Sequence, residues 1–274
     1  MTTSTPKAIA FIGGGNMASA IIGGLLRQGL PASQVEVVEP FAETRDKLKV
    51  QFGIAARESA GPDLQRAGLV VWAVKPQTFK EAAAQAASHT AQALHLSVAA
   101  GIRSDSIAAW LGSERIVRSM PNTPALVGKG MTALFARPGV SAEDKAWVEQ
   151  VIATTGESLW VGPEADLDAV TALSGSGPAY VFFFLEAMTQ AGIEMGLSRE
   201  QAYRLATGTF AGASELARAS QDPPEVLRRR VTSKGGTTYA AISSMENDGV
   251  KALFVHALHA ARKRAEELGD EFGR

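Results

Sequence analysis

The sequence predicts an α/β protein of two domains, a doubly wound sheet followed by a domain built only of helices. Short apolar runs alternate with helical patterns up to about Gly162, and beyond it long helical patterns follow one another without strands. Glycine clusters stand where apolar runs pass into helices, as in βα units. We therefore expect a first domain over residues 1–162 and a second over residues 163–274.

The expected strands are short and almost wholly apolar, as in a parallel sheet that is covered on both faces. They lie at residues 8–12, 35–39, 69–74, 94–99, 116–120 and 131–135. The expected helices of the second domain lie at residues 178–195, 198–220, 224–230, 237–247 and 250–268. In the second of these, Ser198 and Gln201 have the spacing of a capping box.

Composition excludes several classes of protein. The chain has 274 residues, 46% of them hydrophobic, and a formal net charge of -1, which is typical of a globular protein and does not predict a nucleic-acid partner. No apolar run approaches the ~20 residues of a membrane-spanning helix, and no secretory leader is evident, so we expect a cytoplasmic protein without a membrane partner. The absence of cysteine excludes disulfides, a thiolate nucleophile and iron–sulfur clusters.

The first glycine cluster has the pattern G-x-G-x-x-A between a strand and a helix. In a dinucleotide site, the first glycine permits the tight turn, the second lets a pyrophosphate approach the backbone, and the small third residue lets helix and strand pack closely. The alternative is a plain βα turn. The residues predicted to contact the cofactor here are Ile12, Gly13, Gly14, Gly15, Asn16, Met17 and Ala18.

The end of the second strand bears on the choice between NADH and NADPH. Glu39 lies 24 residues beyond Gly15, where an acidic side chain can accept hydrogen bonds from the adenosine ribose of NAD(H) and would repel a 2'-phosphate. Arg45 lies about one helical turn further on and could turn toward such a phosphate. The pattern favours NAD(H), leaves NADP(H) open, and is equally compatible with Glu39 as a solvated strand end.

Three further loops follow predicted strands, on the edge of the sheet where ligands bind in doubly wound folds. Lys75 is the most informative residue among them, although a lone lysine is more often simply solvated. The loop around Asn122 is bracketed by prolines and suits the nicotinamide end of the cofactor, or is merely a turn. The residues predicted to line the cofactor from these loops are Ala73, Val74, Lys75, Pro76, Ala99, Ala100, Gly101 and Asn122.

Six segments, taken together and in this order, resemble pyrroline-5-carboxylate reductase over nearly the whole chain. They are IGGGNMASAIIGGL (12–25), AVKPQ (73–77), SVAAGI (97–102), RSMPNTP (118–124), LSGSGPAY (173–180) and TSKGGTT (232–238). The resemblance implies a Rossmann domain and a helical domain whose helices interleave with a partner's, in a homodimer or higher homo-oligomer, and complete the active site. It also implies the reduction of 1-pyrroline-5-carboxylate to L-proline by NADPH or NADH, the last step of proline synthesis.

The TSKGGTT segment is composed to bind an anion. Its two glycines free the backbone, and successive N–H groups at a helix start can surround a carboxylate. We expect the Ser233 hydroxyl and the amides of Gly236 and Thr237 to hold the substrate carboxylate; the alternative is a helix cap. The resemblance assigns the hydroxyl of Thr238 to the imine nitrogen, which makes Thr238 the predicted catalytic residue.

The resemblance also places an acidic residue, Glu164, at the substrate. The segment from Ser174 to Pro178 is adequately explained as a capped helix start, although its small residues could line the pocket. None of the four histidines adjoins a motif, so we predict no histidine acid and no metal site. The proton would come from a bound water, or the imine would be protonated before the hydride arrives.

Two other functions remain in competition. A β-hydroxyacid dehydrogenase shares the architecture but needs a helical lysine in the second domain, and residues 170–200 contain none. A catalytically silent dinucleotide sensor has no reason to keep a carboxylate-binding loop. The chain also departs from many relatives, which have proline where Lys234 stands and asparagine near Ala60; the first change adds a charge beside the carboxylate loop, and the second weakens any argument on cofactor preference.

Overall fold

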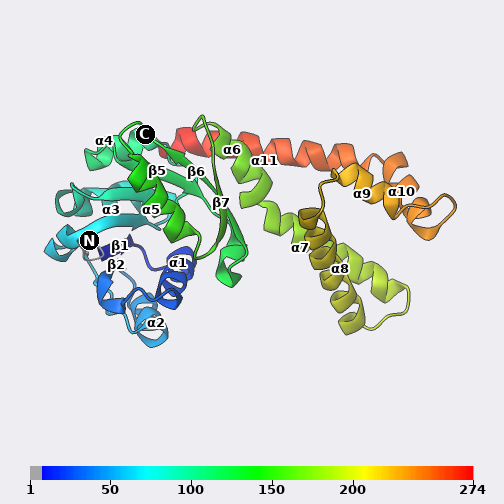
Figure 1. The fold of residues 1–274 in the computed structure, drawn as a ribbon, viewed down its shortest axis with the longest axis horizontal. Coiled ribbons are helices and arrows are strands. Elements are labelled where there is room, and N and C mark those ends of the chain that lie inside the picture. Colours follow the sequence, from blue (N-terminus) through cyan, green and yellow to red (C-terminus); the bar gives the residue numbers. More distant parts are fainter. Residues whose placement is uncertain (1–7, 274) are drawn as a thin grey trace. The chain divides into compact units, whose positions relative to one another are not determined.

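The computed structural model describes residues 8–273 of the chain (Figure 1). Contacts within the chain define a first unit, Met1–Ser176 with Ala261–Arg274, and a second unit, Gly177–Ala260. The first unit extends past the boundary predicted at residue 162, because Glu164 and Asp168 form ion pairs with side chains of the sheet unit. The sequence boundary and the division by compactness therefore differ by 14 residues, from 162 to 176.

The first unit is built on a sheet of seven strands in the order β2-β1-β3-β4-β5-β6-β7. The strands are β1 (Ala8–Ile12), β2 (Val35–Val38), β3 (Ala67–Trp72), β4 (Leu94–Ser97), β5 (Ile116–Met120), β6 (Gly130–Ala136) and β7 (Gly156–Trp160). The six predicted strands are all present, and β7 is additional. Because β2, β1, β3, β4 and β5 pair in parallel, their carboxyl ends share one edge of the sheet.

The expectation of a parallel sheet is wrong for the pair β5 and β6, which is antiparallel. Only residues 121–129 connect these strands, and a parallel crossover needs a dozen or more residues. β7 then pairs in parallel with β6 after a helical crossover. β7 has the sequence GESLW, whose residues are alternately half-buried and exposed, so it contains no apolar run from which it could be predicted.

Helices pack on both faces of the sheet (Figure 1). Alternate residues of each strand enter opposite cores; Ile9 and Phe11 of β1 lie in one, and Ala10 and Ile12 in the other. The first core includes α1 (Asn16–Arg27), α2 (Ala42–Phe52) and α5 (Ala142–Ile152), and the second includes α3 (Pro76–Thr90) and α4 (Ser104–Leu111). Burial on both faces explains why the strands are apolar throughout.

The remaining helices lead into and form the second unit. They are α6 (Asp166–Val170), a π-helical turn (Thr171–Gly175), α7 (Gly177–Glu194), α8 (Arg199–Ala219), α9 (Pro224–Arg230), α10 (Thr237–Asn247) and α11 (Val250–Phe272). The predicted capping box at the start of α8 is confirmed, because Ser198 Oγ accepts from the Gln201 N–H at 3.1 Å and Gln201 Oε1 accepts from the Ser198 N–H at 3.0 Å. α11 belongs to both units, with Val250–Ala260 in the second.

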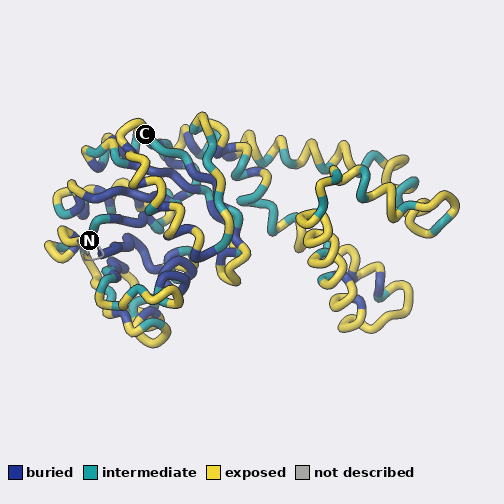
Figure 2. The backbone as a smooth tube through the Cα atoms, in the orientation of Figure 1, coloured by how far each residue is buried: buried dark blue, intermediate teal, exposed yellow. Residues whose placement is uncertain are grey.

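Most of the second unit is exposed in this chain (Figure 2). Its internal packing is local: Phe254 contacts the rings of Tyr180 and Phe184 edge to face, and α7 and α8 approach closely at Gly192. Among residues 8–273, no helix has the length and apolar composition needed to cross a membrane.

One histidine is buried in the sheet. His95 on β4 is 1% exposed, and its Nδ1 accepts a hydrogen bond from Trp72 Nε1 at 3.2 Å. Its Nε2 makes no hydrogen bond within the described part of the chain. Burial, and to a smaller extent the charge of Arg115, lowers the pKa of His95 to about 4. His95 is therefore neutral in the folded protein at neutral pH.

This burial predicts a pH dependence of stability. Between the unfolded pKa of about 6.5 and the folded pKa of about 4, the unfolded chain binds a proton that the folded chain does not, so stability falls on acidification. From pH 7 to pH 5, His95 should cost about 2 kcal/mol of unfolding free energy. We expect His95→Gln to lack this component in denaturant titrations at the two pH values. The exposed His259→Gln is the control, and equal pH slopes for wild type and His95→Gln would contradict the prediction.

Candidate active site

A turn of three glycines, Gly13–Gly15, joins β1 to α1 at the carboxyl edge of the sheet. Gly13 has φ +98°, in the left-handed region that favours glycine. A Cβ at this position would lie 2.6 Å from the carbonyl oxygen of Ala73, at the end of β3. The Gly13 N–H donates to the Val38 carbonyl at 2.8 Å. Only glycine fits this position, and the turn is held between the ends of β2 and β3.

The next two glycines differ in what surrounds them. A Cβ at Gly14 would lie 2.7 Å from Cδ1 of Leu48, whereas a Cβ at Gly15 would meet nothing within 4 Å. Gly15 precedes the first helical residue of α1, and no side chain caps the N–H groups of this helix. An uncapped helix start that faces open space across a residue without a side chain fits the pyrophosphate of a dinucleotide. Ala18, the third small residue of the motif, is fully buried.

Glu39 lies beneath the glycine turn and is 5% exposed. One carboxylate oxygen accepts from the Gly14 N–H at 2.8 Å, and the other accepts from the Phe41 N–H at 2.9 Å. Arg45 donates to the carbonyl oxygens of Glu39 and Pro40 at 2.9 and 2.7 Å. The carboxylate therefore fixes the turn to the end of β2, and a contact with the ribose stays a prediction.

The loops after β3 and β4 lie at the same edge. Lys75 is exposed, and its backbone begins α3, with Pro76 as the first helical residue. In the loop after β4, Gly101 has φ +73°, and a Cβ there would lie 3.1 Å from Cβ of Leu268 in α11. The last turns of α11 therefore support this loop inside the first unit. The structure thus brings the predicted cofactor residues together along the carboxyl ends of the parallel strands.

Asn122 follows β5 and uses both ends of its amide within the first unit. Its Nδ2 donates to the Ser174 carbonyl at 3.0 Å, and its Oδ1 accepts from the Met131 N–H at 2.9 Å. The loop after β5 is thereby tied both to the π-helical turn and to the beginning of β6. Whether Asn122 also contacts a cofactor stays a prediction.

Glu164, predicted at the substrate, belongs to a network of hydrogen bonds and ion pairs inside the first unit. Its Oε1 accepts from the Ser104 N–H at 2.6 Å and from Arg118 Nη1 at 2.5 Å, and its Oε2 accepts from Ser104 Oγ at 2.5 Å. Burial raises the pKa of Glu164, but the Ser104 hydrogen bonds and the Arg118 charge outweigh it, so the pKa lies below its usual value. This carboxylate holds the start of α4 against β5.

The sequence did not predict this network of ion pairs and hydrogen bonds. Arg118 is only 5% exposed and lies in a strand that is otherwise mostly apolar. A second ion pair joins Arg103 to Asp168 at 2.9 Å. The available signal was the charge of Arg118 inside the apolar run IVRSM, since a buried charge requires a partner. Its partner, 46 residues away, is not evident from the sequence.

The predicted carboxylate loop lies in the second unit, before α10. The Gly236 N–H donates to the Ser233 carbonyl at 3.0 Å in this structure, and its contact with a substrate carboxylate stays a prediction. Gly235, with φ +77°, closes a tight turn over these residues. α10 begins at Thr237 without a side-chain cap, and both Thr237 and Thr238 are exposed. The amides at the start of α10 are therefore not capped by a side chain.

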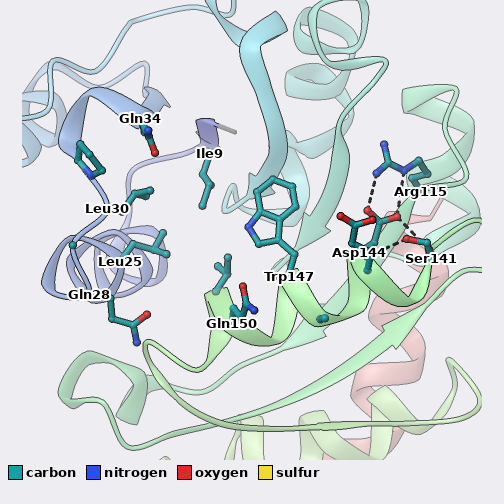
Figure 3. Close-up of a pocket in the computed structure, with 15 residues that line it drawn as sticks. Ile9, Leu25, Gln28, Leu30, Gln34, Arg115, Ser141, Asp144, Trp147 and Gln150 are labelled. Atoms are coloured by element: carbon teal, nitrogen blue, oxygen red, sulfur yellow. Dashed lines mark hydrogen bonds and ion pairs between the residues drawn. The ribbon is translucent and has the colours of Figure 1, made fainter. Parts of the chain in front are cut away.

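A separate cavity of about 730 Å³ lies at the other edge of the sheet, between the end of α1 and α5 (Figure 3). Trp147 and Gln150 point into it, beside the ion pair of Arg115 with Asp144. None of the predicted site residues lines this cavity. Among residues 8–273, no group of three or more histidine, aspartate or glutamate side chains is placed to hold a metal ion.

The contacts of Glu39 predict the effect of Glu39→Gln. An amide has one oxygen, so one of the two backbone donors loses its acceptor, and the negative charge beside the expected ribose position is removed. We expect NADH binding to weaken about tenfold, and NADPH binding less, in fluorescence titrations. Glu58→Gln, at an exposed carboxylate that forms an ion pair with Arg45, is the charge-matched control. An unchanged ratio of the two dissociation constants would contradict the prediction.

Comparison with known families and proteins agrees with this arrangement. Residues 164–268 match the family model for pyrroline-5-carboxylate reductase dimerisation, and residues 8–101 match the model for NADP oxidoreductase, coenzyme F420-dependent. The chain is 48% identical to the pyrroline-5-carboxylate reductase of Pseudomonas aeruginosa, over 98% of this chain and 99% of that one. It is 40% identical to the enzyme of Haemophilus influenzae, over 96% and 97% of the two chains.

Solved structures give the same result. The pyrroline-5-carboxylate reductase of Coxiella burnetii superposes with a TM-score of 0.89 at 37% identity, covering 96% of this chain and 99% of that one. The Plasmodium falciparum enzyme, solved with NADP bound, superposes with a TM-score of 0.86 at 28% identity, covering 96% and 98% of the two chains. With a glycine turn before an uncapped helix start and relatives that match from end to end, the chain belongs to the pyrroline-5-carboxylate reductase family.

Proposed function

We propose that this protein reduces 1-pyrroline-5-carboxylate to L-proline with a reduced nicotinamide cofactor, and so completes proline biosynthesis. The observation that carries the proposal is the glycine turn at the carboxyl edge, where Gly13 has no room for a side chain and Gly15 leaves the start of α1 open. The identity of the substrate is inferred from membership of the family. The sequence prediction of a cytoplasmic protein without nucleic-acid partners stays a prediction.

In this reaction the cofactor supplies the hydride, and the chain binds and orients the substrate. The bound cofactor supplies a hydride to the imine carbon and is itself oxidised, while the ring nitrogen gains a proton from water, before or during this transfer. The chain must bind the carboxylate and orient the ring. We assign the carboxylate to Ser233 Oγ and the amides of Gly236 and Thr237, since an uncapped helix start favours an anion. The Thr238 hydroxyl would donate to the ring nitrogen.

Either NADH or NADPH fits the first unit. Lys75, on the loop after β3, has an ammonium group that makes no ion pair within residues 8–273 and is available to a cofactor phosphate. Glu39 places a carboxylate beside the expected ribose, which favours NADH, whereas Arg45 lies at the same strand end and favours NADPH. We propose that Glu164 acts on the substrate through its charge and not by direct contact. Its carboxylate oxygens are already bound by Ser104 and Arg118 within the first unit.

We also propose a homodimer or a larger homo-oligomer formed through the second unit. The support is the dimerisation model matched by residues 164–268 and the large apolar side chains that this unit exposes. Phe182 is 58% exposed, Phe183 67% and Leu253 66%. Monomeric proteins seldom expose so many large apolar groups together, so these side chains indicate a surface that a second copy covers.

The function itself is tested by following the absorbance of NADH and NADPH with 1-pyrroline-5-carboxylate as substrate. We expect oxidation of at least one cofactor that depends on the substrate, with formation of proline. A β-hydroxyacid in place of L-proline, tested with oxidised cofactor, should give no turnover. Absence of oxidation with both cofactors would refute the proposal.

Thr238→Val tests the assigned catalytic hydroxyl. Valine keeps the shape of the side chain and removes the donor, so kcat should fall about 10- to 100-fold, while the dissociation constant of the cofactor stays unchanged. Thr238→Ser keeps a hydroxyl and should retain most of the turnover. If Thr238→Val turns over at the wild-type rate, Thr238 has no part in the reaction.

A further inference from the structure

The last two turns of α11 belong to the first unit and pack against the loop after β4, which the sequence predicts to line the cofactor. Gly101 in this loop has φ +73°. A Cβ at Gly101 would lie 3.1 Å from Cβ of Leu268 and 3.5 Å from Cδ2 of Phe272. The backbone of the loop is therefore in close contact with the end of α11.

Two further contacts join the same end of α11 to the start of α4 (Figure 1). Ser106 Oγ donates to the Gly273 carbonyl at 2.8 Å. A Cβ at Gly269 would lie 2.7 Å from Nε of Arg103, the residue that precedes α4. The end of α11 thus contacts three successive places in the chain, from the loop after β4 into the first turn of α4.

Phe272 connects this loop with the core of the first unit. It is the last residue of α11, it is half-buried, and its side chain packs against the second core. That core includes Ile102, the neighbour of Gly101, and Ile107 in α4, and both isoleucines are fully buried. One aromatic side chain therefore lies close to the loop glycine and also against the core that the following residues enter.

The loop has backbone donors that the protein does not use. The N–H groups of Ala100 and Gly101 make no hydrogen bond within residues 8–273, and both residues are half-buried. The N–H of the preceding residue, Ala99, donates to Ser97 Oγ at 3.3 Å. A partly accessible N–H without a partner can donate to a ligand oxygen, and these two lie at the carboxyl edge of the sheet, where the cofactor is expected.

We propose that Phe272 is a positioning residue for the cofactor: with the last turn of α11, it holds the loop after β4 in the conformation in which the N–H groups of Ala100 and Gly101 bind the dinucleotide. This role rests on the proposed function, since the cofactor site at this edge is part of it. A loop without this support would have to be ordered by the cofactor itself, which lowers affinity. All of these groups belong to the first unit.

Phe272→Ala tests this role through cofactor binding. Because the unsupported loop is ordered only when the cofactor binds, we expect the NADH and NADPH dissociation constants each to rise about tenfold in fluorescence titrations. Phe272→Leu keeps an apolar side chain against the loop and should stay within about twofold of wild type. Leu111→Ala is the control for lost packing, since Leu111 lies in the same core at the other end of α4. It should lower the melting temperature and leave both dissociation constants within about twofold.

Hydrogen exchange of residues 98–103 measures the order of the loop directly. We expect faster exchange in Phe272→Ala than in wild type without cofactor, and wild-type protection in both proteins once NADH saturates them. Ser106→Ala serves if Phe272→Ala does not fold. It removes only the hydrogen bond to the Gly273 carbonyl, and we expect both dissociation constants to rise about threefold.

Three results would overturn the inference: unchanged cofactor dissociation constants in Phe272→Ala, unchanged exchange of residues 98–103 in that variant, or an equal loss of affinity in Leu111→Ala. The first two would make the contact purely structural, and the third would trace the loss to general destabilisation. Binding by the wild type keeps this inference apart from the function itself. A wild type that binds neither NADH nor NADPH refutes the proposed function, whereas a wild type and a Phe272→Ala variant that bind equally well refute only the role of Phe272.

Discussion

The close approach of Gly13 to the end of β3 is the constraint on which the rest of the first unit depends. A Cβ at residue 13 would lie 2.6 Å from the Ala73 carbonyl oxygen, so no other residue fits without moving β1 away from β3. This proximity brings the ends of β1, β2 and β3 to one point, where α1 begins uncapped. A dinucleotide phosphate can bind at such an open helix start, and the sheet holds the start of α1 in place.

Around this point, polar side chains join loops to one another. Glu39 ties the glycine turn to β2, Asn122 ties the loop after β5 to the π-helical turn, and Glu164 ties α4 to β5. Each of these residues is predicted from the sequence to contact a ligand, and each has its polar atoms engaged within the protein. Such side chains fix loop conformations in advance, which lowers the cost of binding and keeps the reacting groups aligned.

The sequence predicts the strands of the first unit and the bounds of α9 and α10 well, because apolar runs and glycine or proline at helix ends are local signals. It does not predict β7, whose residues GESLW lie at the sheet edge and bury no continuous face. It also cannot predict that Glu164 accepts hydrogen bonds from Ser104, 60 residues away, or that the Gly236 N–H donates to the Ser233 carbonyl. These contacts depend on which loops the fold brings together and on the turn at Gly235. The spacing of residues along the sequence predicts neither.

We expect the first unit to bind the dinucleotide along the carboxyl edge, with its pyrophosphate at the start of α1. A crystal structure of the protein with NADPH or NADH tests this most directly. We expect the pyrophosphate against the amides that follow Gly15, the adenosine end beside Glu39, and the nicotinamide near the loop after β5. A dinucleotide bound instead in the cavity between α1 and α5 (Figure 3), with the glycine turn empty, would show that the glycine turn is not the cofactor site.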